Sequence, residues 1–263
     1  MKIISLMSLL SCGLTASAVE IVAHRGSSHD APENTVSSFK LGWEQKADAC
    51  ELDIRLSSDG RIVVIHDTGT KRIASIDKKV SEQTFAELRA LDAGSWKGMP
   101  WKGEKIPTLA EALATMPEGK KFFIEVKCGV EAFSEMEQVI KSSGKKPQQL
   151  PIITFYPEVA TKAKQKFPEH DVLLLYEWKP DKGSDKVMTV DELISKVKEM
   201  KLDGVDVGAD PIIDAALVKK FKDAGLKFYV WTVDDVETAK KLVSFGVDGI
   251  TTNRPGWLRE QLK

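Results

Sequence analysis

Five side chains suited to acid–base or metal chemistry lie within short apolar runs of the sequence or directly end one. His24 and His66 each end such a run, while Glu51, Asp53 and Glu125 lie inside two others. Carboxylate oxygens are the hard ligands that Mg²⁺ and Ca²⁺ prefer. Imidazoles change charge near neutral pH and can transfer protons. These residue types therefore indicate acid–base chemistry assisted by a divalent cation.

The segment 50–56, Cys-Glu-Leu-Asp-Ile-Arg-Leu, predicts a strand with one charged face. A period of two places Glu51, Asp53 and Arg55 on that face and the apolar residues on the other. If the strand belongs to a barrel, the two carboxylates point inward, which is costly unless they are paired or bind a cation. An ion-pair network with Arg55 and Lys127 is the alternative. We favour a metal site, because barrel enzymes work at the C-terminal ends of their strands.

The segment 121–127 repeats this pattern. Glu125 and Lys127 share a face with Phe123, and apolar residues form the other face. Glu125 therefore supplies a third inward carboxylate. Three hard oxygen ligands predict one bound Ca²⁺ or Mg²⁺ ion rather than zinc. Lys127 supplies a positive charge for an anionic substrate.

Two of the four histidines stand where predicted strands meet loops, beside charged residues. His24 is followed by Arg25, and His66 by an aspartate, so we predict that the two histidines form an acid–base pair. His29 and His170 lack this setting and are expected at the surface. A cation and Arg25 would neutralise phosphoryl oxygens while one imidazole removes a proton and the other donates one. This set indicates hydrolysis of a phosphate ester.

Short apolar runs alternate with amphipathic helical stretches along most of the chain. The predicted strands are 21–24, 50–56, 61–66, 121–127, 151–155, 172–176, 204–207, 227–232 and 249–252. With the hairpin-like run 61–66 set aside, about eight strand–helix pairs predict an α/β fold of the (β/α)8 TIM-type barrel. A doubly wound open sheet has less support, since neither Gly-x-Gly-x-x-Gly after the first strand nor a P-loop is present.

The stretch from about residue 67 to 106 interrupts this alternation after the second strand region. It is too long for an ordinary connection between a strand and a helix. It contains Trp96, Trp101 and several glycines. We interpret it as a small insertion on the catalytic face of a single barrel domain, residues 19–263.

Residues 1–18 predict a secretory signal peptide. Lys2 precedes an apolar run, residues 3–10, and Ala16-Ser17-Ala18 fits cleavage after Ala18. The protein is therefore expected to be secreted or periplasmic. A lipoprotein signal anchored at Cys12 is the alternative, although its preceding residues match that motif poorly. The apolar run is shorter than the roughly 20 residues that span a membrane, and no later stretch predicts a transmembrane segment.

Composition and charge exclude some classes of function. The 263 residues carry a net charge of −1, and acidic and basic residues are interleaved, so no nucleic-acid partner is expected. The hydrophobic fraction of 42% is enough for a large core. Cys50 and Cys128 are expected as buried thiols rather than as a disulfide.

The ordered motifs resemble the glycerophosphodiester phosphodiesterase family. No single triplet is specific, but the set extends in order from about Ile21 to Pro255. The matching stretches are His24–Gly26, Pro32–Thr35, Glu51–Asp53, Asp59–Gly60, Val64–Asp67, Leu91–Trp96, Ile106–Leu109, Glu125–Lys127, Val230–Val233 and Thr252–Pro255.

The resemblance implies a barrel that binds one Ca²⁺ or Mg²⁺ ion and hydrolyses a small-molecule glycerophosphodiester to glycerol 3-phosphate and an alcohol. It implies that Glu51, Asp53 and Glu125 ligate the metal. It also implies that His24 and His66 form the acid–base pair, without saying which of them is the acid. The glycerol 2-hydroxyl is expected to attack first, giving a cyclic phosphate that water then opens.

The resemblance also implies that Arg25 and Lys127 hold the phosphate and that Trp231 contacts the substrate. Two stretches at the expected mouth of the site, 177–182 and 205–210, depart from the family pattern, so they leave the head-group preference open. A related phospholipase that acts on lysophospholipids is one alternative. A barrel that binds a phosphorylated ligand without catalysis is the other, although both histidines and all three carboxylates are present.

Overall fold

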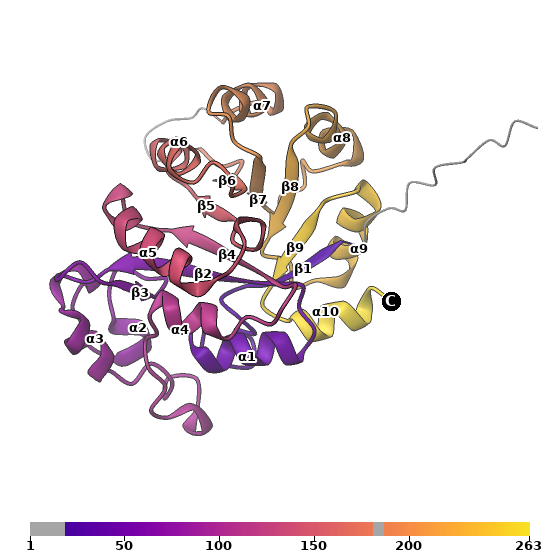
Figure 1. Cartoon of the computed structure of the whole chain (residues 1–263). Coiled ribbons are helices and arrows are strands. Elements are labelled where there is room, and N and C mark those ends of the chain that lie inside the picture. The colour runs from indigo at the N-terminus through magenta and orange to yellow at the C-terminus, as the bar shows by residue number, and fades with distance from the viewer. Residues whose placement is uncertain (1–18, 181–186) are drawn as a thin grey trace, which may run out of the picture.

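The apolar runs predicted as strands form a closed parallel barrel. The computed structural model describes residues 19–180 and 187–263, so the predicted signal peptide, residues 1–18, lies outside the described residues. Strand β1 pairs in parallel with both β2 and β9, which closes the sheet (Figure 1). The parallel strands of the described chain are β1 (Glu20–Ala23), β2 (Ala49–Leu56), β4 (Lys121–Val126), β5 (Ile152–Thr154), β6 (Val172–Tyr176), β7 (Gly204–Gly208), β8 (Lys227–Trp231) and β9 (Gly249–Thr252). The predicted eight-stranded α/β barrel is confirmed.

Helices surround the barrel and follow the strands along the chain (Figure 1). The capping boxes of Thr108 with Glu111 and of Thr189 with Glu192 satisfy backbone N–H groups where two of these helices begin. The outer helices are α1 (Val36–Glu44), α4 (Leu109–Ala114), α5 (Phe133–Ser143), α6 (Pro157–Lys166), α7 (Val190–Glu199), α8 (Ala215–Asp223), α9 (Val236–Phe245) and α10 (Pro255–Gln261), with 3-10 turns η3 (Val130–Ala132) and η4 (Pro147–Gln149).

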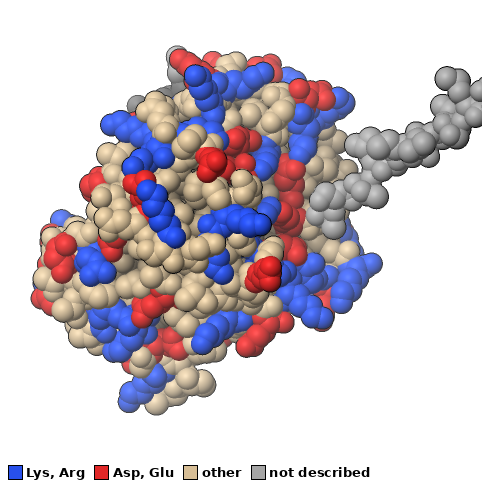
Figure 2. Space-filling model, in the orientation of Figure 1, with Lys and Arg blue, Asp and Glu red and all other residues tan. Residues whose placement is uncertain are grey.

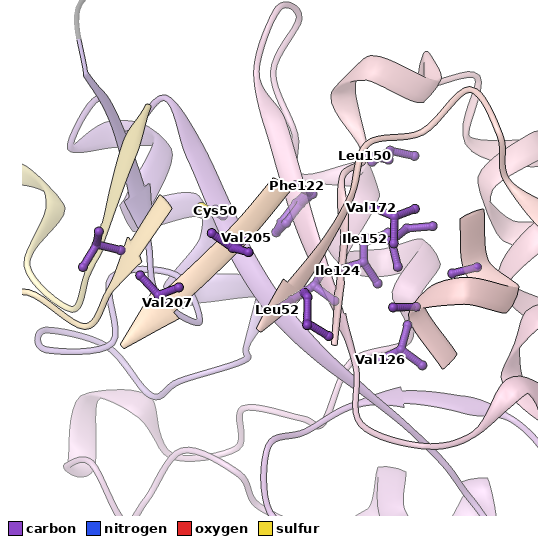
Figure 3. Close-up of a cluster of buried hydrophobic side chains, with 14 of the residues drawn as sticks. Cys50, Leu52, Phe122, Ile124, Val126, Leu150, Ile152, Val172, Val205 and Val207 are labelled. Carbon is purple, nitrogen blue, oxygen red and sulfur yellow. The ribbon is translucent and has the colours of Figure 1, made fainter. Parts of the chain in front are cut away.

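Period-two alternation divides each strand between two environments. On β2, Cys50 and Leu52 face the helices and join the outer core together with Ile124 of β4 (Figure 3). Their neighbours Glu51 and Asp53 therefore point into the barrel. The apolar packing of the outer face thus fixes the direction of the acidic side chains.

An apolar layer fills the barrel below the acidic residues. Its members are Val22, Ala49, Phe123, Ile153, Leu173, Leu175 and Tyr229. The rings of Phe123 and Tyr229 lie 5.1 Å apart between centroids. Glu125 and Trp231 lie two residues further along the same strands, so the functional groups rest directly on this layer, toward the C-terminal ends of the strands.

The predicted insertion follows a hairpin between β2 and the short strand β3 (Ile62–Val64), which is antiparallel to β2. Its elements are α2 (Lys71–Ala74), η1 (Val80–Glu82), α3 (Phe85–Ala90) and η2 (Met99–Trp101). They cover a separate small core made of Val63, Ile65, Ile73, Val80, Leu88, Ala93 and Ile106. This core explains why a segment without long helices or strands is ordered beside the barrel.

Charges of both signs are mixed on the molecular surface. The face shown in Figure 2 has Lys and Arg side chains interspersed with Asp and Glu. Among the described residues, no helix combines the length and the apolar character needed to cross a bilayer. Cys50 and Cys128 are both free thiols, the first buried and the second partly buried.

Candidate active site

Three carboxylates converge inside the barrel, as the strand pattern predicts. Parallel pairing of β2 with β4 places Asp53 opposite Glu125, and Glu51 is one inward position earlier on β2. Each of the three residues offers an oxygen atom, and these oxygens lie within 4.8 Å of one another. Glu51 and Asp53 are 3% and 0% exposed, so water cannot screen their mutual repulsion.

Cationic side chains offset only part of this negative charge, and mainly at Asp53. Arg25 Nε lies 3.3 Å from Asp53 Oδ2, and Lys127 Nζ lies 3.4 Å from Oδ1. The Asn34 side-chain amide donates to Asp53 Oδ2 at 2.7 Å. Burial would raise the pKa of Asp53, but Arg25 and Lys127 outweigh it and hold the pKa below its usual range. Asp53 is therefore the carboxylate that stays ionised.

The negative charges of Glu51 and Glu125 are less well balanced by neighbouring cations than that of Asp53. Burial, followed by the charges of Asp53 and Glu125, raises the pKa of Glu51 well above its usual value. Burial and the charge of Asp53 raise the pKa of Glu125 to about 7, although Lys127 Nζ donates to its Oε1 at 2.7 Å. Glu51 Oε1 is buried and has no hydrogen-bond partner among the described residues. A hard divalent cation would satisfy this free oxygen and the excess charge, so the cluster fits a Ca²⁺ or Mg²⁺ ion.

The loop after β1 has an unusual backbone that serves the site. Arg25 and Asn34 have positive φ angles of 55° and 57°, a conformation that few non-glycine residues adopt. This geometry lets the Arg25 backbone N–H donate to Glu51 Oε2 at 2.9 Å. The next residue, Gly26, has a φ of 80°, and an added Cβ would lie 2.3 Å from Ser38 Oγ. Arg25 and Asn34, whose polar groups contact the carboxylates, are thus also the residues with a strained backbone conformation in this loop.

His24 follows β1 and is held by an amide. Asn253 Nδ2 donates to Asp234 at 2.6 Å, which leaves Asn253 Oδ1 to accept from His24 Nδ1 at 2.7 Å. His24 Nε2 is therefore the atom that can accept a proton. Desolvation, and then the charge of Arg25, lowers the pKa of His24 to about 4. The ring is neutral at physiological pH.

His66 follows β3 and is held by a carboxylate. Its Nδ1 lies 2.8 Å from Asp67 Oδ1, and Arg72 Nε donates to Asp67 Oδ2 at 2.7 Å. Burial would raise the pKa of Asp67, but hydrogen bonds from Arg72 and His66 lower it to about 2. Because Asp67 is ionised, His66 Nδ1 donates and Nε2 remains free. Desolvation lowers the pKa of His66 as well, but its partner is an anion rather than a neutral amide.

A cavity of about 270 Å³ is lined by seven of the eight predicted site residues. The cluster residue that does not line it is Asp53, which is buried beneath Arg25 and Lys127. Trp231 forms part of the wall, with its ring edge-on to Phe155 at 5.6 Å. The lining residues are His24, Arg25, Glu51, His66, Glu125, Lys127, Ile153, Phe155, Leu175, Asp206, Trp231, Thr232 and Thr251. The cavity has a charged side from β1 to β4 and a mainly apolar side from β5 to β8.

Two sequence interpretations differ from the structure. His170, expected at the surface, is 6% exposed and its Nδ1 bonds the Leu150 carbonyl at 2.8 Å, so that prediction is wrong. It packs edge-on against Phe167, and a buried imidazole needs such a partner. Arg55, offered as an ion-pair partner of the carboxylates, instead donates to the His66 carbonyl at 2.8 Å. His29 is exposed as expected.

Four polar residues at the site were not predicted as functional. Asn34, Asp67 and Asn253 lie in motifs that the sequence analysis quotes, but their roles emerge only from their contacts with Asp53, His66 and His24. Asp206 lies on β7 in the sequence Gly-Val-Asp-Val-Gly. Period two predicts that this acid points inward between two outward valines, and that signal was overlooked. It is 2% exposed and lines the cavity.

Comparisons with known proteins agree with this geometry. A model of the glycerophosphoryl diester phosphodiesterase family matches residues 24–257. A glycerophosphodiester phosphodiesterase of Caldanaerobacter subterraneus is 32% identical over 89% of this chain and 94% of its own length. One of Bacillus subtilis is 30% identical over 92% of this chain and 86% of its own length. The solved structure of an Oleispira antarctica phosphodiesterase in complex with the product sn-glycerol-3-phosphate covers 92% of this chain and 96% of its own, with a TM-score of 0.81 and 30% identity. The chain belongs to the glycerophosphoryl diester phosphodiesterase family.

Proposed function

We propose that this enzyme hydrolyses glycerophosphodiesters to glycerol 3-phosphate and an alcohol. The observation that carries the proposal is the shared cavity of about 270 Å³, into which two imidazoles, two cationic side chains and two carboxylates of the acidic cluster open. Membership of the family supports the reaction class. The product bound to the Oleispira antarctica relative supports glycerol 3-phosphate as the product here.

We propose that Glu51, Asp53 and Glu125 hold the cation. Their oxygens lie close enough to share one ion, and the buried Glu51 Oε1, which has no hydrogen-bond partner among the described residues, supports this assignment. When bound, Ca²⁺ or Mg²⁺ would stabilise negative charge on the phosphoryl oxygens.

Arg25 and Lys127 would hold the phosphate. Both already pair with the acidic cluster, Arg25 with Asp53, and Lys127 with Asp53 and Glu125. Their donors therefore lie beside the place where an anionic substrate enters. Trp231 and Phe155 would pack against the organic part of the substrate, because they form the apolar wall opposite.

We infer that His24 is the base of the first step and His66 the acid. His24 is neutral and its Nε2 is free, so it can accept a proton from the glycerol 2-hydroxyl or from water. Desolvation lowers the pKa of His66, but the Asp67 carboxylate opposes this and favours the charged ring, which can then donate to the departing oxygen. Attack and departure occur on opposite sides of phosphorus, so two separate groups are needed. If a cyclic phosphate forms, the roles exchange when water opens it.

A panel of head groups tests the proposed function. Purified protein with Ca²⁺ or Mg²⁺ is expected to release glycerol 3-phosphate from glycerophosphocholine, glycerophosphoethanolamine and glycerophosphoglycerol, measured by a coupled glycerol 3-phosphate assay. A lysophospholipid with the same choline head group is the matched comparison. Faster release of choline from the lysophospholipid would support the phospholipase alternative. Binding of glycerol 3-phosphate without turnover of any substrate would support the non-catalytic barrel.

We also propose that residues 1–18 direct export and are removed. The small residues at 16 and 18 and the apolar run before them support this proposal. Mass spectrometry of protein recovered from the native host is expected to find Val19 at the N-terminus. A lipid on Cys12 would instead identify a lipoprotein, and an intact Met1 would contradict both forms of export.

A further inference from the structure

Asp206 is a buried acid whose carboxyl group has no hydrogen-bond partner in the part of the chain that the structure describes. It is 2% exposed, and its Oδ1 atom is buried without a hydrogen bond to any described residue. Such a group costs free energy in the folded protein, because water solvated it before folding. A residue that lowers stability in this way needs another explanation for its presence.

The surroundings of Asp206 explain why its Oδ1 has no partner among the residues 19–180 and 187–263. Its partners across the sheet are Leu175 on β6 and Tyr229 on β8, which belong to the inner apolar layer. The Tyr229 hydroxyl is committed elsewhere, since it donates to Glu20 Oε2 at 2.9 Å. Trp231 Nε1 bonds the Asp206 backbone carbonyl at 3.1 Å and not its carboxyl group. The carboxyl group is thus a polar point on an otherwise apolar wall.

Asp206 lies close enough to the proposed metal cluster for the charge of Glu125 to act on it, but it does not belong to the cluster. The three carboxylates whose oxygens converge are Glu51, Asp53 and Glu125, and Asp206 is not among them. It nevertheless lines the same cavity, on the side formed by Leu175, Ile153 and Trp231. A substrate whose phosphate lies between Arg25, Lys127 and the cluster would extend its organic part toward that side.

We propose that Asp206 binds a free hydroxyl of the glycerol moiety and so selects glycerol against apolar groups of the same shape. This inference rests on the proposed function. A carboxyl group in either protonation state can accept an alcohol O–H, so the contact does not depend on the charge of Asp206. The apolar wall would contact the carbon chain of the glycerol moiety, while Asp206 would accept a hydrogen bond from one of its hydroxyls. A site built to bond a hydroxyl discriminates strongly against a ligand that lacks it.

The test compares two ligands that differ only in hydroxyls, glycerol 3-phosphate and n-propyl phosphate, by calorimetry with Ca²⁺ or Mg²⁺ present. Wild-type protein is expected to bind glycerol 3-phosphate roughly 10- to 100-fold more tightly, the usual cost of leaving a buried acceptor without its donor. Asp206→Leu should remove most of this difference by weakening glycerol 3-phosphate alone. Asp206→Asn keeps an acceptor oxygen and should retain part of the preference. Leu175→Val, the matched control on the neighbouring strand, should affect both ligands equally.

Stability measurements separate recognition from a structural role. Without ligand, the thermal midpoint of Asp206→Leu should be no lower than that of wild type, because the variant removes an unsatisfied buried group. If the leucine variant does not fold, Asp206→Ala removes the same carboxyl group. An unchanged preference, an equal weakening of both ligands, or weaker binding of the cation alone would overturn the inference.

Failure of the proposed function would look different. In that case the wild-type protein would hydrolyse none of the glycerophosphodiesters, whatever the effect of Asp206 on ligand binding. If instead hydrolysis occurs and the variants keep the wild-type preference for glycerol 3-phosphate, the function stands and the role of Asp206 is wrong.

Discussion

Removal of divalent cations is expected to lower the rate of glycerophosphodiester hydrolysis by about 10³-fold or more. Added Ca²⁺ or Mg²⁺ should restore the rate. A cation that stabilises transition-state charge contributes several kcal/mol, and each 1.36 kcal/mol is a tenfold change in rate. Arg25 and Lys127 supply two positive charges to the three carboxylates Glu51, Asp53 and Glu125, which leaves negative charge that a cation would neutralise. The measurement is release of glycerol 3-phosphate after exhaustive chelation and dialysis, then after addition of each ion. Full activity in the chelated protein would contradict the metal site.

Glu51→Gln provides the matched variant for this prediction. Because the pKa of Glu51 is raised in the folded state, the metal-free wild type loses stability as the pH rises above the ordinary glutamate value of 4.5. The glutamine keeps an oxygen for the Arg25 N–H and carries no charge. In chelator it should therefore be more stable than wild type by about 1–4 kcal/mol at neutral pH, a difference that shrinks on acidification. It should also gain less stability from added cation. A variant that is less stable than wild type in chelator would refute this account.

Much of the fold follows from local patterns in the sequence. The strand containing Glu51 and Asp53 is recognisable because Cys50, Leu52 and Ile54 alternate with charged residues, and the structure packs those three against the helices. Capping boxes such as Thr108 with Glu111 likewise locate the first residues of helices, because donor and acceptor lie within one turn of each other. Such signals depend only on neighbours in the chain.

The arrangement of the site depends on contacts that sequence spacing does not encode. Asn253 bonds His24 across 229 residues, and Asn34 bonds Asp53 across 19, so neither role could be read from a local pattern. The exposed position predicted for His170 was wrong for a similar reason, because its partner is the carbonyl of Leu150 on another segment. Composition shows that a histidine is present, but only the tertiary structure determines what surrounds it.

These long-range contacts give the two histidines different chemical characters. Asn253 offers His24 a neutral carbonyl oxygen, whereas Asp67 offers His66 a negative charge that Arg72 holds in place. The sequence predicts the pair but does not assign acid and base. Desolvation lowers the pKa of both rings, but Asp67 opposes this at His66, so His66 is the ring better able to carry the proton and His24 the better acceptor, and this difference can be tested directly.

Alanine at either His24 or His66 is expected to lower the rate on a glycerophosphodiester by roughly 10²–10⁴-fold, the usual size of general acid–base catalysis. The double variant should lose much less than the product of the two effects, because the residues act in one step. Neither substitution should prevent folding or cation binding, since neither ring is proposed as a metal ligand. Near-native rates in both single variants would refute the acid–base assignment.

The pH dependence and the leaving group distinguish the two roles. The wild-type specificity constant should follow a bell-shaped profile. Its acid limb reflects protonation of His24, whose pKa is about 4, and its alkaline limb reflects deprotonation of His66. A nitrophenyl ester needs little protonation of its leaving oxygen, so it should restore the rate of His66→Ala but not that of His24→Ala. Asp67→Asn should shift the alkaline limb to lower pH, because the amide cannot stabilise a charged His66 as the carboxylate does. Rescue of His24→Ala instead would reverse the assignment of acid and base while leaving the pair intact.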